Sequence, residues 1–145
     1  NIVPDPAIDP LPVEETARIP GDLAICGLLE KQANFIGEYT TVLLPRSAKE
    51  TVREVLTEEP RSALVDVECW IRLLEKGDLL YIVDTLSYFR KHEGQSSNDP
   101  AIHAACARAW AKLLRERAAQ ESGMRRKKMF EQAELIETFL RARGR

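Results

Sequence analysis

The sequence has no long run of apolar residues and no strong excess of charge of either sign. Nothing in its 145 residues approaches the roughly 18 consecutive apolar residues that a membrane span needs. The 21 basic and 23 acidic side chains leave a formal net charge of −2, which argues against a general polyanion-binding surface and so against a nucleic-acid partner. A local basic patch remains compatible with this charge balance.

Cysteine is also scarce in the sequence. Cys26, Cys69 and Cys106 are odd in number, lie far apart and form no CxxC pair. This pattern argues against a disulfide framework and against a structural zinc site. Each cysteine lies in an apolar helical pattern, so we expect buried free thiols in a reducing compartment. We therefore expect a cytoplasmic protein, and leave open a peripheral attachment to a membrane.

Several motifs of nucleotide-binding proteins and hydrolases are missing. The sequence has no GxGxxG, P-loop, HExxH or GxSxG string. It also has no DxD, and the closest string, Asp66-Val67-Glu68, lies inside a predicted helix. The chain thus offers no complete site for a nucleotide or a metal ion, and we expect it to bind no cofactor alone.

The first twenty residues differ in composition from the rest. Residues 1–20 hold five of the eight prolines. Proline removes an amide donor and biases the residue before it away from helix, so we expect an extended arm. The chain begins with Asn rather than Met. We therefore expect a piece of a longer protein, in which the arm contacts a preceding segment.

The rest of the sequence indicates a helix-rich α+β fold, with about five helices and two or three short strands. Apolar residues recur at helical spacing in five stretches. The clearest start is Asp99, a capping residue followed by Pro100 at the first helical position. Helices are predicted within residues 21–32, 47–59, 66–76, 99–122 and 124–145.

Aromatic and β-branched residues predict the strands. Residues 39–44 are expected to form one strand, residues 79–83 a buried second strand, and residues 85–92 a further extended segment. So few strands rarely make a stable sheet. Either they form a small sheet under the helices, or their partners lie on a missing segment, and the second alternative fits the start at Asn1 better. The predicted organisation is an arm, a central segment and a C-terminal helical hairpin, at residues 1–20, 21–98 and 99–145.

Asp66 is the first candidate for chemistry. A carboxylate in the first turn of a helix satisfies free backbone amides and interacts favourably with the helix dipole, which is a purely structural role. A carboxylate held there can also accept a proton from an alcohol and act as a general base. The residues alone leave both roles open.

His92, His103 and a basic cluster are the other candidates. His92 follows a predicted strand beside Arg90 and Lys91, which would favour an anion such as a diphosphate, although a lone histidine is commonly a surface residue. His103 and Cys106 share a helix face, but two ligands do not make a zinc site. The RRKK run that begins at Arg125 could contact phosphate or simply be solvated.

Four blocks of sequence follow one another at sensible spacing. They are NFIGEYTTVLLPRS from Asn34, DVECWIRLL from Asp66, GDLLYI from Gly77 and LSYFRKHEGQSS from Leu86. Together they resemble the C-terminal part of family-2 glycosyltransferases. The resemblance covers roughly residues 20–97, and four ordered blocks are more specific than one short motif.

The resemblance implies an inverting sugar transferase of the GT-A fold. Such an enzyme uses a nucleotide-sugar donor, a hydroxyl acceptor and usually Mg²⁺ or Mn²⁺. Asp66 would be the base that deprotonates the acceptor, and Trp70 would anchor the helix behind it. His92 and Arg90 would face the metal and the diphosphate, with His92 as a metal ligand only together with a DxD-bearing half. The acceptor side would be lined by Asn34, Gly37 and Glu38.

The sequence departs from the family in one large respect. The family's N-terminal, nucleotide-binding half with its DxD has no counterpart here, and Val65 stands where relatives often have Glu. We therefore expect an acceptor-side portion that is inactive alone. Two alternatives remain open: a non-catalytic helical module that dimerises or docks through residues 99–145, and a relic that binds glycan without turnover.

Overall fold

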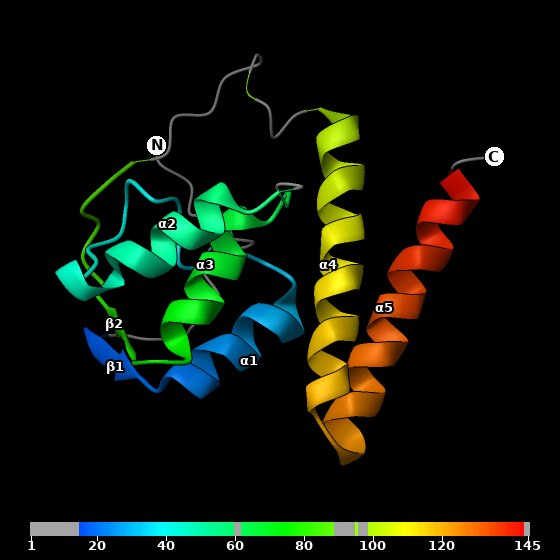
Figure 1. The fold of residues 1–145 in the computed structure, drawn as a ribbon, viewed down its shortest axis with the longest axis horizontal. Helices are drawn as coiled ribbons and strands as arrows, with labels where there is room; N and C mark the ends of the chain where they lie inside the picture. The colour runs from blue at the N-terminus through cyan, green and yellow to red at the C-terminus, as the bar shows by residue number, and fades with distance from the viewer. Residues whose placement is uncertain (1–14, 60–61, 89–94, 96–98, 144–145) are drawn as a thin grey trace. The chain divides into compact units, whose positions relative to one another are not determined.

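The computed structural model describes residues 15–59, 62–88, 95 and 99–143. Within these ranges, five helices and a two-stranded sheet confirm the expected helix-rich α+β class (Figure 1). Their order is β1 (Ala17–Ile19), α1 (Gly21–Lys31), the 3-10 turn η1 (Arg46–Ala48), α2 (Lys49–Thr57), α3 (Val65–Leu74), β2 (Leu79–Tyr81), α4 (Pro100–Gln120) and α5 (Gly123–Arg143). The elements from β1 to β2 form one compact unit, and α4 and α5 with residues 62–64 form a second.

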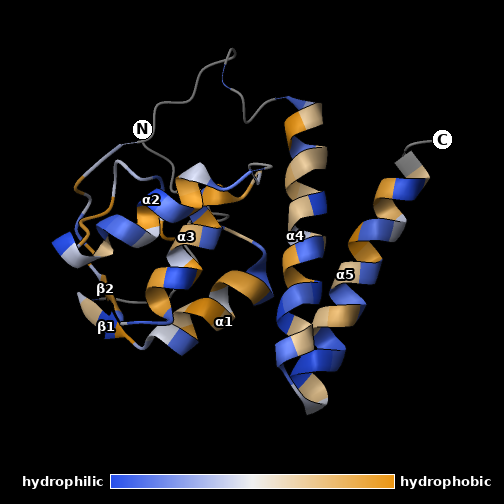
Figure 2. Cartoon of the chain, in the orientation of Figure 1, coloured by the Kyte–Doolittle hydropathy of each residue, from blue (hydrophilic) through white to orange (hydrophobic). Residues whose placement is uncertain are grey.

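The core of the first unit is built on α3. Its buried side chains include Val67, Trp70, Ile71 and Leu74, which fall on one helix face as predicted. Both α1 and α2 pack against α3, and Figure 2 shows α1 as mostly hydrophobic. Most of the buried apolar side chains of this unit lie on these three helices. Burying one large apolar side chain stabilises the folded state by about 1.5–3 kcal/mol, so the packing of the helices contributes much of the unit's stability.

The two strands bring a distant carboxylate to the start of α1. They pair antiparallel, with Ile19 opposite Leu79. This register places Asp78 beside α1, where its Oδ1 accepts a hydrogen bond from the Gly21 amide at 3.1 Å. Its Oδ2 accepts another from Arg18 Nε at 2.6 Å. Asp78 therefore caps a helix whose own N-terminal residue provides no side-chain cap.

Asp78→Asn is expected to lower stability at neutral pH but not in strong acid. The Gly21 amide, and then the Arg18 guanidinium, hold the pKa of Asp78 below its ordinary value. A group with a depressed folded pKa stabilises the fold fully above its unfolded pKa, and loses that contribution as the pH falls through the folded pKa. The thermal unfolding midpoints of the unmodified chain and of Asp78→Asn, measured over a range of pH, test this prediction. A difference between the two midpoints that stays the same at every pH would contradict it.

The predicted strand at residues 39–44 is wrong. Residues 39–41 form a turn in which the Thr41 amide and hydroxyl donate to the Glu38 carbonyl, at 2.9 and 2.8 Å. Gly37, just before this turn, has a backbone φ of 105°, a conformation that glycine adopts more readily than other residues. Leu43 is then 95% exposed. A strand-like composition produces a strand only where a partner strand and a half-buried face are available.

The second apolar run is only partly a strand. Of residues 79–83, the three from Leu79 to Tyr81 are strand. Leu80 is 63% exposed and Val83 43% exposed, so the prediction of a buried strand is wrong. Residues 85–88 have no regular structure, and the rest of the predicted segment at residues 89–92 lies outside the described residues.

The second unit is a hairpin of α4 and α5, two helices of 21 residues each (Figure 1). α4 begins as predicted, because the Asp99 side chain accepts from the Ala101 amide at 2.8 Å and Pro100 follows the cap. Arg115 on α4 donates two hydrogen bonds to Glu137 on α5, at 2.7 and 2.9 Å. In the described ranges, no helix is both long and apolar enough to cross a membrane.

Candidate active site

Asn34 joins the loop after α1 to the start of α3. Its Nδ2 donates to Asp66 Oδ2 at 2.7 Å and to the Gly37 carbonyl at 3.1 Å. Its Oδ1 accepts from the Gly37 amide at 3.1 Å. One side chain therefore closes the turn at residues 34–37 and holds a carboxylate from a helix 32 positions further along the chain.

Asp66 is half-buried in the first turn of α3. Besides the bond from Asn34, its Oδ1 accepts from the Val67 amide at 2.8 Å. Both carboxylate oxygens are thus held by neutral amide donors. The carboxylate is fixed in direction without a cationic partner in these contacts, and each oxygen keeps acceptor capacity for a further donor such as a hydroxyl.

Trp70 fixes the same turn from the core side. It is only 2% exposed, and its Nε1 donates to the Gly37 carbonyl at 3.1 Å. The Gly37 carbonyl therefore accepts from both Asn34 and Trp70. Trp70 therefore connects the core face of α3 to this turn.

Tyr39 and Cys69 complete the cluster, although no sequence motif singles out either residue. The Tyr39 hydroxyl donates to the Val65 carbonyl at 3.3 Å, and its ring lies 4.9 Å from that of Trp70. Burial, and then a hydrogen bond with Cys69, raise the pKa of Tyr39 above its ordinary value. Burial also raises the pKa of the Cys69 thiol. Both raised pKa values favour the protonated form of these groups at neutral pH.

The remaining sequence candidates do not join this cluster through the contacts described above. Glu38 is exposed on the turn, where its backbone carbonyl accepts from Thr41. Arg90 and His92 lie outside the described residues, so their roles stay predictions. Cys106 directs its thiol to the Ala63 carbonyl at 3.8 Å. In the part of the chain that the structure describes, no three His, Cys, Asp or Glu side chains gather as a metal site would require.

Asn34 can be tested as the residue that holds Asp66. Asn34→Ala is expected to lower the free energy of unfolding by about 1–3 kcal/mol, because Asp66 loses a donor and the turn loses two bonds. Asn34→Asp should cost more at neutral pH, where two carboxylates would meet, and the excess should shrink in acid as one of them protonates. Urea unfolding at two pH values measures both variants. Equal losses at both pH values would contradict the contact.

No protein-family model, curated protein or solved structure matches the chain. A functional assignment therefore rests on the order of the sequence blocks and on the contacts of Asn34, Gly37, Asp66 and Trp70.

Proposed function

We propose that the chain forms the acceptor side of an inverting glycosyltransferase, which moves a sugar from a nucleotide-sugar to an acceptor hydroxyl. One observation carries the proposal. The first two sequence blocks, which begin at Asn34 and Asp66, meet through a 2.7 Å hydrogen bond between those two residues. Blocks that serve one reaction must converge in space, and this contact supports that reading.

In the proposed reaction, Asp66 is the general base. It accepts the proton of the acceptor hydroxyl while that oxygen forms a bond to the anomeric carbon of the donor sugar. The bond from the anomeric carbon to the diphosphate oxygen breaks, and its electron pair leaves with the nucleoside diphosphate. The single displacement inverts the anomeric centre. A half-buried carboxylate held without a cation, as the contacts of Asp66 describe, supports this role.

Asn34 takes a positioning role in this proposal. The sequence resemblance places Asn34, Gly37 and Glu38 on the acceptor side. The hydrogen bonds of Asn34 to Asp66 and to the Gly37 turn favour a narrower role, in which it directs Asp66 Oδ2. An oriented base is more effective because the reacting atoms must be aligned before the proton moves.

The proposed enzyme also needs a site for the nucleotide-sugar donor, and none of the contacts above belongs to that site. Mg²⁺ or Mn²⁺ would supply positive charge to the leaving diphosphate, with His92 and Arg90 facing it. Among the residues that the structure describes, no three His, Cys, Asp or Glu side chains lie together in a group that could hold this ion. We further propose a cytoplasmic location, because Cys26, Cys69 and Cys106 are all free thiols.

Calorimetric titration with nucleotide-sugars and Mn²⁺ tests the proposal. We expect no binding by the 145-residue chain, which has no DxD, and binding by the product of the complete gene. Tight binding by the chain alone would show that it holds the donor site, and the roles of Asp66 and His92 would be wrong. An absence of binding in both proteins would argue against a nucleotide-sugar enzyme.

A further inference from the structure

Charge is divided unevenly along the chain. Residues 1–98 carry 10 basic and 17 acidic side chains, whereas residues 99–145 carry 11 basic and 6 acidic ones. The first part thus has a net charge of −7 and the second a net charge of +5, which together give the −2 of the whole chain. A charge asymmetry of this kind favours an anionic partner for the basic part.

Basic side chains gather at the end of the hairpin where α4 connects to α5, here called the hairpin tip (residues 121–128). Four consecutive basic residues occupy the first two turns of α5, and all four are exposed. They are Arg125, Arg126, Lys127 and Lys128. Each lies within about 8 Å of Gly123 along the helix axis. Successive residues are about 100° apart around a helix, so the four side chains surround the start of α5 instead of forming a stripe.

Acidic side chains near the tip are fewer than the basic ones. Glu121 is half-buried, and Glu131 lies just beyond the tip, with its Oε1 3.8 Å from Lys127 Nζ. The two side chains of that pair are 77% and 62% exposed, and such an exposed pair is weak. Residues 121–131, with four basic and two acidic side chains, keep a net charge of +2. Because basic residues at a helix start oppose the helix dipole, they do not stabilise α5 itself.

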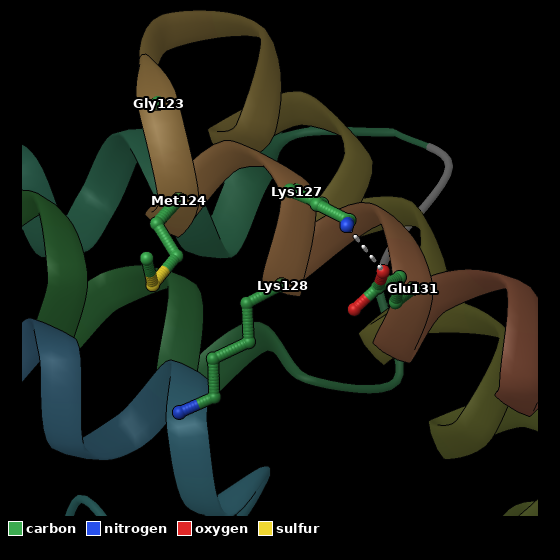
Figure 3. Close-up of a pocket in the computed structure, with 5 residues that line it drawn as sticks. All are labelled: Gly123, Met124, Lys127, Lys128 and Glu131. Carbon is green, nitrogen blue, oxygen red and sulfur yellow. Dashed lines mark ion pairs between the residues drawn. The ribbon is translucent and has the colours of Figure 1, made fainter.

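An exposed apolar side chain lies among these charges. Met124 is 85% exposed, more than any other large apolar residue that the structure describes in α4 and α5. In Figure 3 its side chain and that of Lys128 extend on the same side of the helix. Both belong to a surface depression that is lined by Gly123, Met124, Lys127, Lys128 and Glu131. The surface therefore suits a partner that offers negative charge beside an apolar phase.

We propose that the hairpin tip binds end-on to the surface of an anionic lipid bilayer. The four basic side chains then contact the anionic headgroups, and Met124 enters the layer between them. A flat surface meets side chains on every side of the helix start, whereas a partner lying along α5 would meet only one or two. Charges more than about 8 Å from the bilayer are largely screened at physiological ionic strength, so the tip governs the attraction. The inference does not depend on the proposed transferase activity.

A bilayer suits the tip better than a nucleic acid does. Phosphates of a nucleic acid would pair with the basic side chains but would leave Met124 in water. Single-stranded nucleic acids are bound on aromatic side chains, and residues 121–128 contain none. Phe130, the next aromatic residue, is half-buried and faces the guanidinium groups of Arg115 and Arg126, at 6.0 and 5.6 Å.

Sedimentation with lipid vesicles provides the first test. The 145-residue chain would be mixed with vesicles of phosphatidylcholine alone, and with vesicles in which about a third of the lipid is phosphatidylserine. We expect binding to the second kind only, and release as the ionic strength is raised. Equal binding to both kinds of vesicle, or binding to neither, would overturn the proposal.

Arg125→Gln/Lys128→Gln tests the contribution of the basic side chains. Each Lys or Arg near an anionic surface contributes about fivefold in affinity, so this variant should bind about 25-fold more weakly. Arg108→Gln/Arg141→Gln is the matched control, because it also removes two exposed basic side chains, but about 20 Å along their helices from the tip. We expect the control to bind like the unmodified chain. An equal effect in the two variants would show that the tip is not the binding surface.

Met124→Ala tests the insertion of the apolar side chain. We expect affinity for the anionic vesicles to fall about tenfold, because alanine has little apolar surface to bury. Leu135→Ala is the control, since Leu135 is also exposed, at 72%, but lies further along α5. Its affinity should be unchanged. Unchanged binding by Met124→Ala would overturn the insertion and with it the proposal.

An oligonucleotide distinguishes a bilayer from a nucleic acid as the partner. Single- and double-stranded oligonucleotides would be titrated in the same buffer, at the same concentration of negative charge as the anionic vesicles. We expect weaker binding than to the vesicles, and no effect of Met124→Ala on it. Binding as tight as to the vesicles would assign the tip to nucleic acid and overturn the proposal. Circular dichroism establishes that each variant keeps its helices.

Discussion

Replacing Asp66 with Asn in the product of the complete gene is expected to reduce sugar transfer by roughly 100- to 10,000-fold. Asparagine keeps the size of the side chain, and its one carbonyl oxygen can still accept from either the Asn34 side chain or the Val67 amide, which donate to different oxygens of Asp66. It cannot take a proton from the acceptor hydroxyl at neutral pH. The affinity for the nucleotide-sugar donor, measured by calorimetry, should be unchanged. The loss of activity should therefore appear as a lower turnover rate.

Asp22→Asn is the matched control for this substitution. Asp22 occupies the first turn of α1, and its Oδ1 accepts from the next amide, Leu23, at 2.9 Å, much as Asp66 accepts from Val67 at 2.8 Å. Asp22 is exposed. We expect full transfer activity from this variant. Unchanged turnover in Asp66→Asn, or an equal loss in both variants, would remove Asp66 as the base.

Gly21→Ala is expected to destabilise the first unit by about 3 kcal/mol or more, because overpacking at a rigid backbone contact forces the helices apart. Gly21 is buried where α1 meets the end of α3. A Cβ added there would lie well inside van der Waals contact with the carbonyl oxygens of Leu74 and Gly77. Both are backbone atoms, so neither can move without displacing its segment. This displacement would also weaken the hydrogen bond that the Gly21 amide donates to the Asp78 carboxylate.

Gly77→Ala provides the comparison for this substitution. A Cβ at Gly77 meets no atom within 4 Å. We therefore expect a change of less than about 1 kcal/mol, since the substitution affects mainly backbone freedom. Denaturant unfolding of the two variants measures the difference. Equal stabilities would show that α1 does not approach residues 74–77 as closely as the structure has it.

The helices were the predictable part of the fold, because their signals are local. Asp99 and Pro100 mark the start of α4 with two adjacent residues, and the bond from the Ala101 amide confirms the cap. The apolar spacing of Val67, Trp70, Ile71 and Leu74 likewise predicts the buried face of α3. A helix satisfies its backbone within one segment, so its sequence carries most of the necessary information.

The strands and the long-range cap could not be predicted in the same way. Residues 39–44 have a strand-like composition, but Gly37 and the bonds of Thr41 to Glu38 produce a turn. Asp78 caps a helix that begins 57 residues earlier, and no local pattern signals that pairing. A strand or a distant cap depends on which segment lies beside it, which a single sequence does not state.

Part of the candidate site was accessible from the sequence through the order of its blocks. That order singles out Asn34, Gly37 and Asp66, and the structure joins all three by hydrogen bonds. Tyr39 lies in a strand-like stretch of sequence, which does not signal that its hydroxyl reaches the Val65 carbonyl. A buried thiol such as Cys69 has the same helical pattern as any apolar core residue, so no sequence signal distinguishes it.

The anomeric configuration of the transferred sugar is the most direct test of the central claim. The product of the complete gene would be incubated with nucleotide-sugars and a panel of hydroxyl acceptors, and the new glycosidic bond followed by proton NMR from the first turnovers. With Asp66 as a base for a single displacement, we expect every product to have the configuration opposite to that of its donor. Retention of configuration would contradict the account, because it requires a mechanism other than one inverting displacement.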